Sequence, residues 1–170
     1  MFEGWDGFYL LIGSASAGLI GLLFVVMTLM SGVDRDRAMR GASLYTTPIV
    51  FHFAVVLVIS ALSAVPGLTA AVAGLAVMAC ALAGVVYVAV IAPPLRKGIP
   101  PETPHWSDFW CYGVVPGVVY LGLAAAAAMI WAAPRGAAYG VGADLLALLL
   151  ISIRNAWDLV TWLAPRANSG

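Results

Sequence analysis

Apolar residues fall into five long runs along the chain, separated by short polar segments. The runs cover residues 8–30, 47–65, 68–92, 110–131 and 138–163. A helix needs about 20 mostly apolar residues to cross about 30 Å of hydrocarbon, and each run is close to that length. Open strands cannot satisfy their backbone hydrogen bonds in lipid, so every run is predicted to be helical. The sequence therefore predicts an all-α polytopic integral membrane protein with five transmembrane helices, forming a single transmembrane domain over residues 1–170.

The segments around the runs predict how the spans begin and end. Pro66-Gly67 is a tight-turn dipeptide, which predicts an antiparallel hairpin of the second and third spans. Thr47-Pro48 is typical of a helix start, where the missing N–H of proline costs nothing. Pro93-Pro94 is expected to end the third span. Residues 1–7 contain two acids and no Lys or Arg, so the first span is expected to be retained rather than cleaved as a signal peptide.

The basic residues predict the orientation of the spans. Cytoplasmic loops of membrane proteins are enriched in Lys and Arg. Of the eight basic residues, Arg135 alone lies on one side of the predicted membrane and Arg154 lies inside a span. The rest lie on the other side: Arg35, Arg37, Arg40, Arg96, Lys97 and Arg166. This bias predicts an N-terminus outside and a C-terminus in the cytoplasm. The tryptophans fall near the predicted span ends, as in an aromatic belt.

Composition supports a location in a membrane. The chain is 63% hydrophobic and only 9% charged, with a mean hydropathy of +1.00, whereas about 25% of residues in soluble domains are charged. The formal net charge is zero, so bulk electrostatics does not favour a nucleic-acid partner. Cys80 and Cys111 are interpreted as small packing residues rather than a disulfide framework.

Small residues mark faces on which the spans are expected to pack. Ser14, Gly18, Gly21 and Thr28 lie within about 40° of one line along the first span, if each residue turns the helix by about 100°. Small residues at such spacing let helix backbones approach closely where lipid supplies no hydrophobic drive to associate. The pattern predicts a compact bundle or a seam between copies of the chain.

The last span carries charged and amide side chains. Charged groups inside a membrane-spanning helix are costly, and they usually face the bundle interior or a wet cavity. Helical spacing places Arg154, Asn155, Asp158 and Thr161 on one stripe about 120° wide. Arg154 and Asp158 are four residues apart and can form an ion pair along the helix. This stripe is the strongest candidate for a functional site.

A histidine in the second span is expected to lie at the same depth. At 1.5 Å per residue, both His52 and Asp158 lie about 8 Å inside the predicted cytoplasmic boundary. Tyr45 lies near the same line as His52 on the second span. We therefore predict that the second and fifth spans face each other or a shared cavity. His52, Arg154, Asn155 and Asp158 would then form one cluster in the cytoplasmic half.

Three roles fit such a cluster. A hydrogen-bond and ion-pair network would fix helix register, with Arg154 extended toward the headgroups. A proton or ion relay, or a gate, would use His52, whose side chain type titrates near neutral pH, and Asp158 as its exchange partner. A site for a lipid headgroup would use Arg154 and Arg166 to bind phosphate.

The sequence predicts no enzyme, catalytic residues, cofactor or metal. It contains no evident pair of a nucleophile and a base. Glu102, His105, Asp108 and Cys111 recur every three residues, but such a mixed set of oxygen, nitrogen and sulfur ligands is a weak metal signal.

Several segments resemble small bacterial inner-membrane proteins to which no activity is assigned. They are residues 13–18 (GSASAG) leading into 23–26 (LFVV), residues 47–53 (TPIVFHF) and residues 154–158 (RNAWD). The resemblance covers about half of the chain and implies a bacterial cytoplasmic membrane.

The combined prediction is a small homo-oligomeric channel or transporter in which the polar cluster lines or gates the path. The alternative is a non-catalytic accessory or structural subunit of a larger membrane complex. Both readings have the lipid bilayer as a partner and neither includes nucleic acid.

Overall fold

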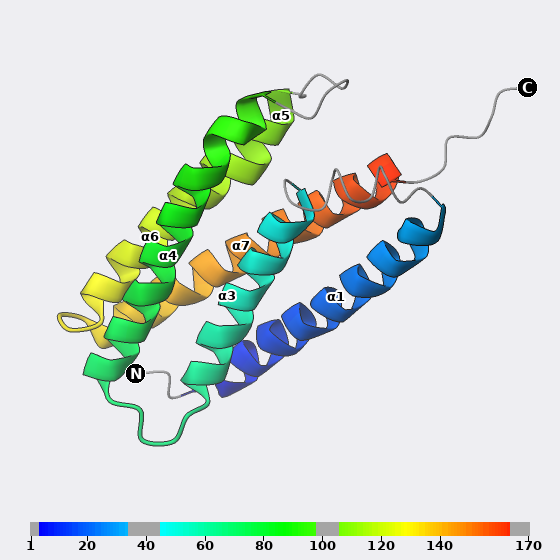
Figure 1. Ribbon diagram of the computed structural model, residues 1–170. Helices are drawn as coiled ribbons and strands as arrows, with labels where there is room; N and C mark the ends of the chain where they lie inside the picture. The colour runs from blue at the N-terminus through cyan, green and yellow to red at the C-terminus, as the bar shows by residue number, and fades with distance from the viewer. Residues whose placement is uncertain (1–3, 34–44, 98–105, 164–170) are drawn as a thin grey trace, which may run out of the picture.

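The computed structural model describes residues 4–33, 45–97 and 106–163. Within these ranges every regular element is a helix, which confirms the predicted all-α class (Figure 1). The elements are α1 (Asp6–Val33), α3 (Thr47–Ser63), α4 (Ala70–Lys97), α5 (Trp106–Asp108), the π-helix η2 (Phe109–Val114), α6 (Val115–Met129) and α7 (Pro134–Leu163). α5, η2 and α6 follow one another without a break and form one long helix with a π-helical section.

Four of the described helices are long and apolar enough to cross a membrane. They contain the segments Asp6–Leu29, Ala70–Arg96, Phe109–Met129 and Arg135–Thr161. The helix of the second apolar run, Thr47–Ser63, has 17 residues and is a shorter apolar helix. The described helices are therefore compatible with a membrane protein.

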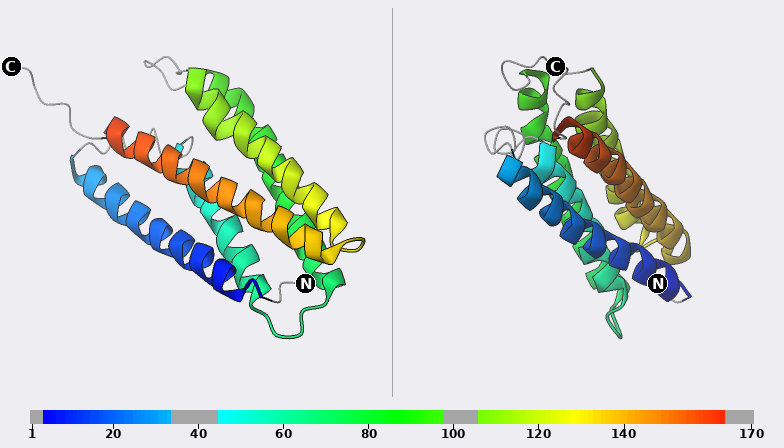
Figure 2. Two further views of the ribbon diagram at one scale, coloured as in Figure 1. Left: turned by 180° about the vertical axis from the view of Figure 1, so that it is seen from behind. Right: turned by 90° about the vertical axis from the view of Figure 1, so that its right-hand side faces the viewer.

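Consecutive long helices run in opposite directions and pack as two hairpins crossed by α7 (Figures 1 and 2). α1 packs on α3, and α4 packs on α6. α7 contacts α6, α3 and α1, and it crosses α3 obliquely. The predicted contact between the second and fifth spans is thus confirmed.

The predicted turn between α3 and α4 is also confirmed. Gly67 has a φ of +70°, a left-handed conformation that glycine adopts without the steric cost of a Cβ. Thr69 Oγ1 accepts a hydrogen bond of 3.3 Å from the backbone N–H of Val72, so this threonine caps the start of α4.

The prediction that Pro93-Pro94 ends the third span was wrong. α4 continues through both prolines to Lys97. Each proline removes one helical N–H, but both lie within the last turns of the helix and are exposed. Prolines are tolerated in membrane helices where local adjustments satisfy the freed carbonyls.

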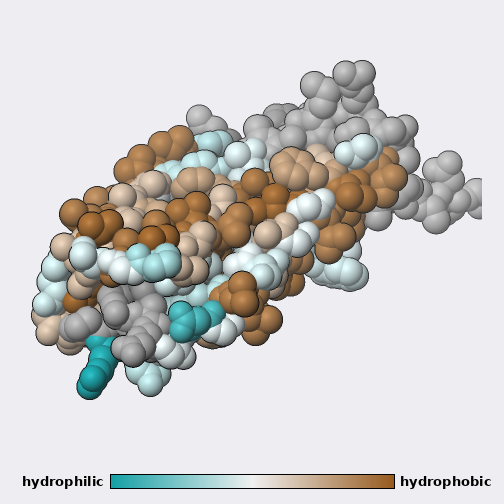
Figure 3. Space-filling view, turned by 90° about the horizontal axis from the view of Figure 1, so that it is seen from below, coloured by the Kyte–Doolittle hydropathy of each residue, from teal (hydrophilic) through white to brown (hydrophobic). Residues whose placement is uncertain are grey.

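Large apolar side chains cover the outside of the bundle. Leu10, Leu75 and Val86 are 71%, 64% and 62% exposed, and many others resemble them. Figure 3 shows apolar colour over most of the visible face, with the deepest hydrophilic colour near one end. Contiguous apolar surface of this extent marks contact with lipid or protein rather than water.

The residues on which the predicted orientation mainly depends, Arg35, Arg37, Arg40 and Arg166, lie outside the described residues. Glu102 and His105, from the weak metal pattern, lie outside them too. The orientation therefore stays a prediction.

Candidate functional site

His52 lies fully buried on α3 and is hydrogen-bonded to a tyrosine of α6. The Nδ1 atom of His52 and the hydroxyl oxygen of Tyr120 are 2.8 Å apart, and both side chains are 0% exposed. Tyr87, from α4, lies nearly perpendicular to the imidazole with 6.5 Å between ring centres. Tyr87 also stacks on Phe51 with 4.3 Å between ring centres. We call His52, Tyr87 and Tyr120 the central cluster, because three helices contribute to it.

Gly84 makes room for the central cluster. A Cβ built on Gly84 of α4 would overlap ring carbons of Tyr120. Only glycine therefore allows the ring of Tyr120 to lie against the backbone of α4, from which its hydroxyl reaches His52.

Four buried polar atoms have no hydrogen-bond partner within the described part of the chain. They are His52 Nε2, Tyr87 Oη, Ser60 Oγ and Ser152 Oγ. An unpaired buried donor or acceptor costs about 1–3 kcal/mol. Such groups in native proteins call for an explanation, such as an internal water or a functional role. Two of the four belong to the central cluster, which marks it as the most unusual polar group of the interior.

Asn155 connects α7 to the π-helical section. Its Nδ2 donates to the carbonyl oxygen of Cys111 at 2.9 Å, and its backbone carbonyl accepts from the hydroxyl of Tyr112 at 2.9 Å. The geometry of η2 explains this contact. The N–H of Val115 bonds the carbonyl of Trp110, and Pro116 has no N–H to offer. The carbonyl of Cys111 is thereby left to the side chain of Asn155, which is fully buried.

The other predicted residues of the fifth span surround Asn155. Arg154 and Asp158 form an ion pair of 3.8 Å, with side chains 40% and 48% exposed. Arg154 Nη1 also donates to Asn155 Oδ1 at 3.1 Å. Thr161 donates to the backbone carbonyl of Asp158 at 2.9 Å. We call Arg154, Asn155 and Asp158, with Cys111 and Tyr112, the end cluster.

Tyr45, two residues before the start of α3, contacts the end cluster. Its hydroxyl donates to Asp108 Oδ2 at 3.4 Å, and its ring lies edge-on to Tyr112 with 5.3 Å between ring centres. Tyr45 therefore joins the same end of the bundle as the predicted residues of the fifth span.

The structure divides the predicted single layer into two groups. Among the described residues, no hydrogen bond or ion pair joins His52 to Arg154, Asn155 or Asp158. Cys111 lies level with Asn155, and Gly122 lies level with Asp144. This register puts Tyr120 level with about residue 146, and Asp158 about 18 Å farther along α7 at 1.5 Å per residue.

The predicted common depth assumed that both spans enter the membrane at a shared boundary. α3 has 17 residues and α7 has 30, and α7 crosses α3 obliquely (Figure 1). Equal counts from the two helix ends therefore need not reach equal levels along the bundle, and the depth of these residues in a membrane stays a prediction.

Asp144 is a further acid within α7. A Cβ on Gly122 of α6 would come within 2.7 Å of Asp144 Oδ1, so this carboxylate lies directly against the backbone of α6. Asp144 and Asp158 lie on opposite sides of the level of Tyr120. Asp144 is thus within about 3 Å of that level, and Asp158 is about 18 Å from it along α7.

Sequence reasoning missed Tyr87, Tyr120 and Ser152 as site residues. A signal was present, because a hydroxyl in the middle of an apolar run must find a partner or stay unpaired. The partner itself depends on how the helices are arranged.

Comparison with known proteins gives no relative from which a function can be transferred. No protein family, curated protein or solved structure matches the chain.

Proposed function

We propose that the chain is a small channel or transporter in the membrane, in which buried His52 takes up and releases protons. The observation that carries the proposal is the imidazole of His52, which is held by Tyr120 through one nitrogen while Nε2 has no hydrogen-bond partner among the described residues. Ionisable residues within membrane spans commonly belong to ion or proton pathways.

The hydrogen bond to Tyr120 suits a relay. A proton that binds Nε2 makes the ring cationic, and the ring can then release its Nδ1 proton to the hydroxyl oxygen of Tyr120 as that hydroxyl passes its own proton onward. Together the two steps pass one proton through the pair and leave the ring neutral with its proton on Nε2, so the ring must return to the Nδ1 tautomer before the next cycle. Histidine is the side chain best suited to such exchange near neutral pH.

Polar groups along α7 supply the two ends of the path. Asp144 lies beyond the level of Tyr120 on one side, and Ser152 lies between that level and the end cluster on the other. Ser152 is fully buried, and its hydroxyl has no hydrogen-bond partner in the part of the chain that the structure describes. The separation from Asp144 to Asp158 is about 21 Å along the helix, most of the thickness of the hydrocarbon.

The proposal includes five spans. α3 lies between α1 and α4 in the chain and runs opposite to both (Figure 1). Its 17 residues extend about 25 Å, close to the hydrocarbon thickness of the thinner membranes. The basic residues favour an N-terminus outside and a cytoplasmic C-terminus, and the sequence resemblance favours a bacterial inner membrane.

Proton flux into vesicles tests the proposed function. Purified protein is reconstituted into vesicles with a pH-sensitive dye inside, and a potassium diffusion potential drives protons inward. We expect faster acidification than in protein-free vesicles. Equal rates, together with no passage of sodium, potassium or a panel of small solutes, would contradict the proposal.

The outward face of α1 favours a second role, as a subunit of an assembly. Ser14, Gly18 and Gly21 are exposed, and a Cβ on either glycine would meet nothing within 4 Å. This small-residue face is open to a helix of a second copy or of a larger membrane partner.

The mass of the assembly in gentle detergent separates these two roles. Dissociation of a homo-oligomer by Gly18→Leu would support the channel. Ala83→Leu, on the outside of α4, is the matched control and should leave the oligomer intact. A stoichiometric larger partner would support the accessory subunit.

A further inference from the structure

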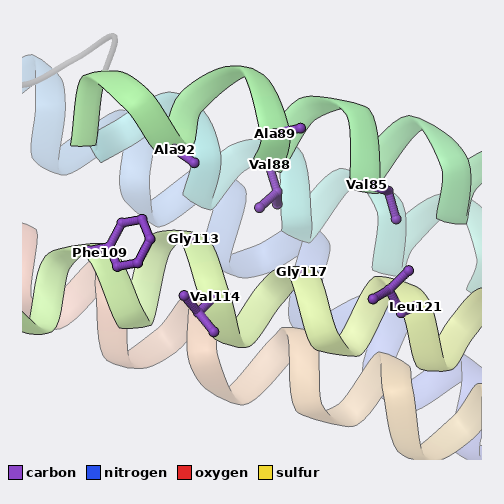
Figure 4. Close-up of a pocket in the computed structure, with 9 residues that line it drawn as sticks. All are labelled: Val85, Val88, Ala89, Ala92, Phe109, Gly113, Val114, Gly117 and Leu121. Atoms are coloured by element: carbon purple, nitrogen blue, oxygen red, sulfur yellow. The ribbon is translucent and has the colours of Figure 1, made fainter. Parts of the chain in front are cut away.

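An apolar groove lies on the outside of the bundle between α4 and the long helix that contains η2 and α6. It encloses about 270 Å³ and runs from Val85 and Leu121 at one end to Ala92 and Phe109 at the other (Figure 4). All its lining side chains are apolar. Leu121 is 60% exposed, so the groove opens toward the hydrocarbon.

Small residues form the floor of the groove. Gly113 and Gly117 lie one turn apart, and a Cβ on Gly117 would touch Val88 Cγ1 at 3.4 Å. The two helices therefore approach closely at the floor, and the groove does not continue into the interior. Ala89 lines the wall on the α4 side and is exposed.

A cationic side chain, that of Arg96, lies at one end of the groove. The guanidinium carbon of Arg96 lies 4.4 Å from the ring centre of Phe109, which lines the groove. Arg96 follows Ala92 by four residues, so it continues the groove face of α4 by one turn. It is exposed, and no carboxylate pairs with it within the described residues. The cation–π contact keeps the guanidinium near the groove mouth.

We propose that the groove binds one acyl chain of an anionic phospholipid whose phosphate pairs with Arg96. The apolar groove ends at a guanidinium group, just as the apolar tail of a phospholipid ends at a charged headgroup. Arginine binds phosphate through paired hydrogen bonds, and basic pockets between membrane helices are known sites for anionic headgroups. The positive-inside bias puts Arg96 at the level of the inner headgroups.

The size of the groove favours a lipid chain over a helix of a second copy. An α-helix with its side chains is about 10–12 Å across. A groove of about 270 Å³ can hold only the tips of one row of side chains from such a helix. An acyl chain is a single methylene group wide and fits within the groove. The proposal is independent of proton transport, because it concerns other residues, which lie on the outside of the bundle.

Native mass spectrometry of the intact protein tests the site. The protein is released from detergent in the presence of equal amounts of phosphatidylglycerol and phosphatidylcholine. We expect the wild type to retain one phosphatidylglycerol with severalfold preference. Arg96→Gln should remove the preference, whereas Arg135→Gln, an exposed arginine at the opposite end of the bundle, should keep it.

Two matched replacements of alanine by phenylalanine test the groove itself. Ala89→Phe fills the groove from its wall and should reduce retention of both lipids, whereas Ala83→Phe, exposed on another face of α4, should behave as wild type. Circular dichroism confirms that both variants fold. Equal retention of the two lipids by wild type, or equal behaviour of the two phenylalanine variants, would overturn the proposal. Loss of an oligomer in Ala89→Phe would do so too, because a second copy would then occupy the groove.

Discussion

The imidazole of His52 and the hydroxyl of Tyr120 meet at 2.8 Å across 68 positions of the chain. This contact ties α3 to α6 in the buried interior of the bundle. If the tyrosine donates, Nε2 carries the ring proton and lacks an acceptor. If Nδ1 donates, Nε2 is an acceptor without a donor. In either tautomer the pair leaves one reactive nitrogen inside the bundle.

Tyr120→Phe removes the hydroxyl and leaves His52 Nδ1 without its partner. We expect a loss of about 1–3 kcal/mol in the free energy of unfolding, because a buried polar group becomes unpaired. Chemical denaturation in mixed micelles measures it. Tyr139→Phe is the control, since Tyr139 is 69% exposed. A double variant with His52→Phe should recover part of the loss, and strictly additive losses would mean that the two side chains do not interact.

Asn155→Leu should destabilise the bundle more than a change in the neighbouring ion pair. It removes the side-chain donor to the carbonyl of Cys111, which the π-helical section and Pro116 leave without a backbone partner among the described residues. We expect a loss of about 1–3 kcal/mol on the same denaturation assay. Asp158→Asn should cost about 0–1 kcal/mol, because the Arg154 pair is half-exposed. The reverse order would show that the ion pair, not the amide, holds α7 to η2.

Gly84→Ala should distort the central cluster. The new methyl group would overlap the ring of Tyr120, and overpacking of this kind costs about 1–3 kcal/mol. Gly136→Ala is the matched control, since Gly136 is exposed on α7 and a Cβ there meets nothing within 4 Å in the described part of the chain. The fluorescence and thermal stability of the purified variants report the difference. Equal stability of the two variants would place Tyr120 away from α4.

The sequence predicted the helices well and their mutual placement only in part. Hydrophobic run length depends on residues that are neighbours in the chain, so the helical class and the turn at Gly67 could be predicted. The pairing of His52 with Tyr120 depends on how α3 and α6 lie relative to each other and on the space beside Gly84, which no local pattern contains. Asn155 was identified as a polar residue of the interior, but its partner Cys111 became available only through the π-helical section. Pro93 and Pro94 were misjudged because their effect depends on how near the helix end they lie.

Proton conductance of His52→Phe in reconstituted vesicles tests the central claim most directly. Under an imposed diffusion potential, wild type should acidify the vesicle interior faster than protein-free vesicles, and Tyr139→Phe should match wild type. His52→Phe, folded and reconstituted in equal amount, should fall to the rate of protein-free vesicles, because phenylalanine can neither bind nor release a proton. Unchanged conductance in His52→Phe would contradict the account, since protons would then cross without the imidazole.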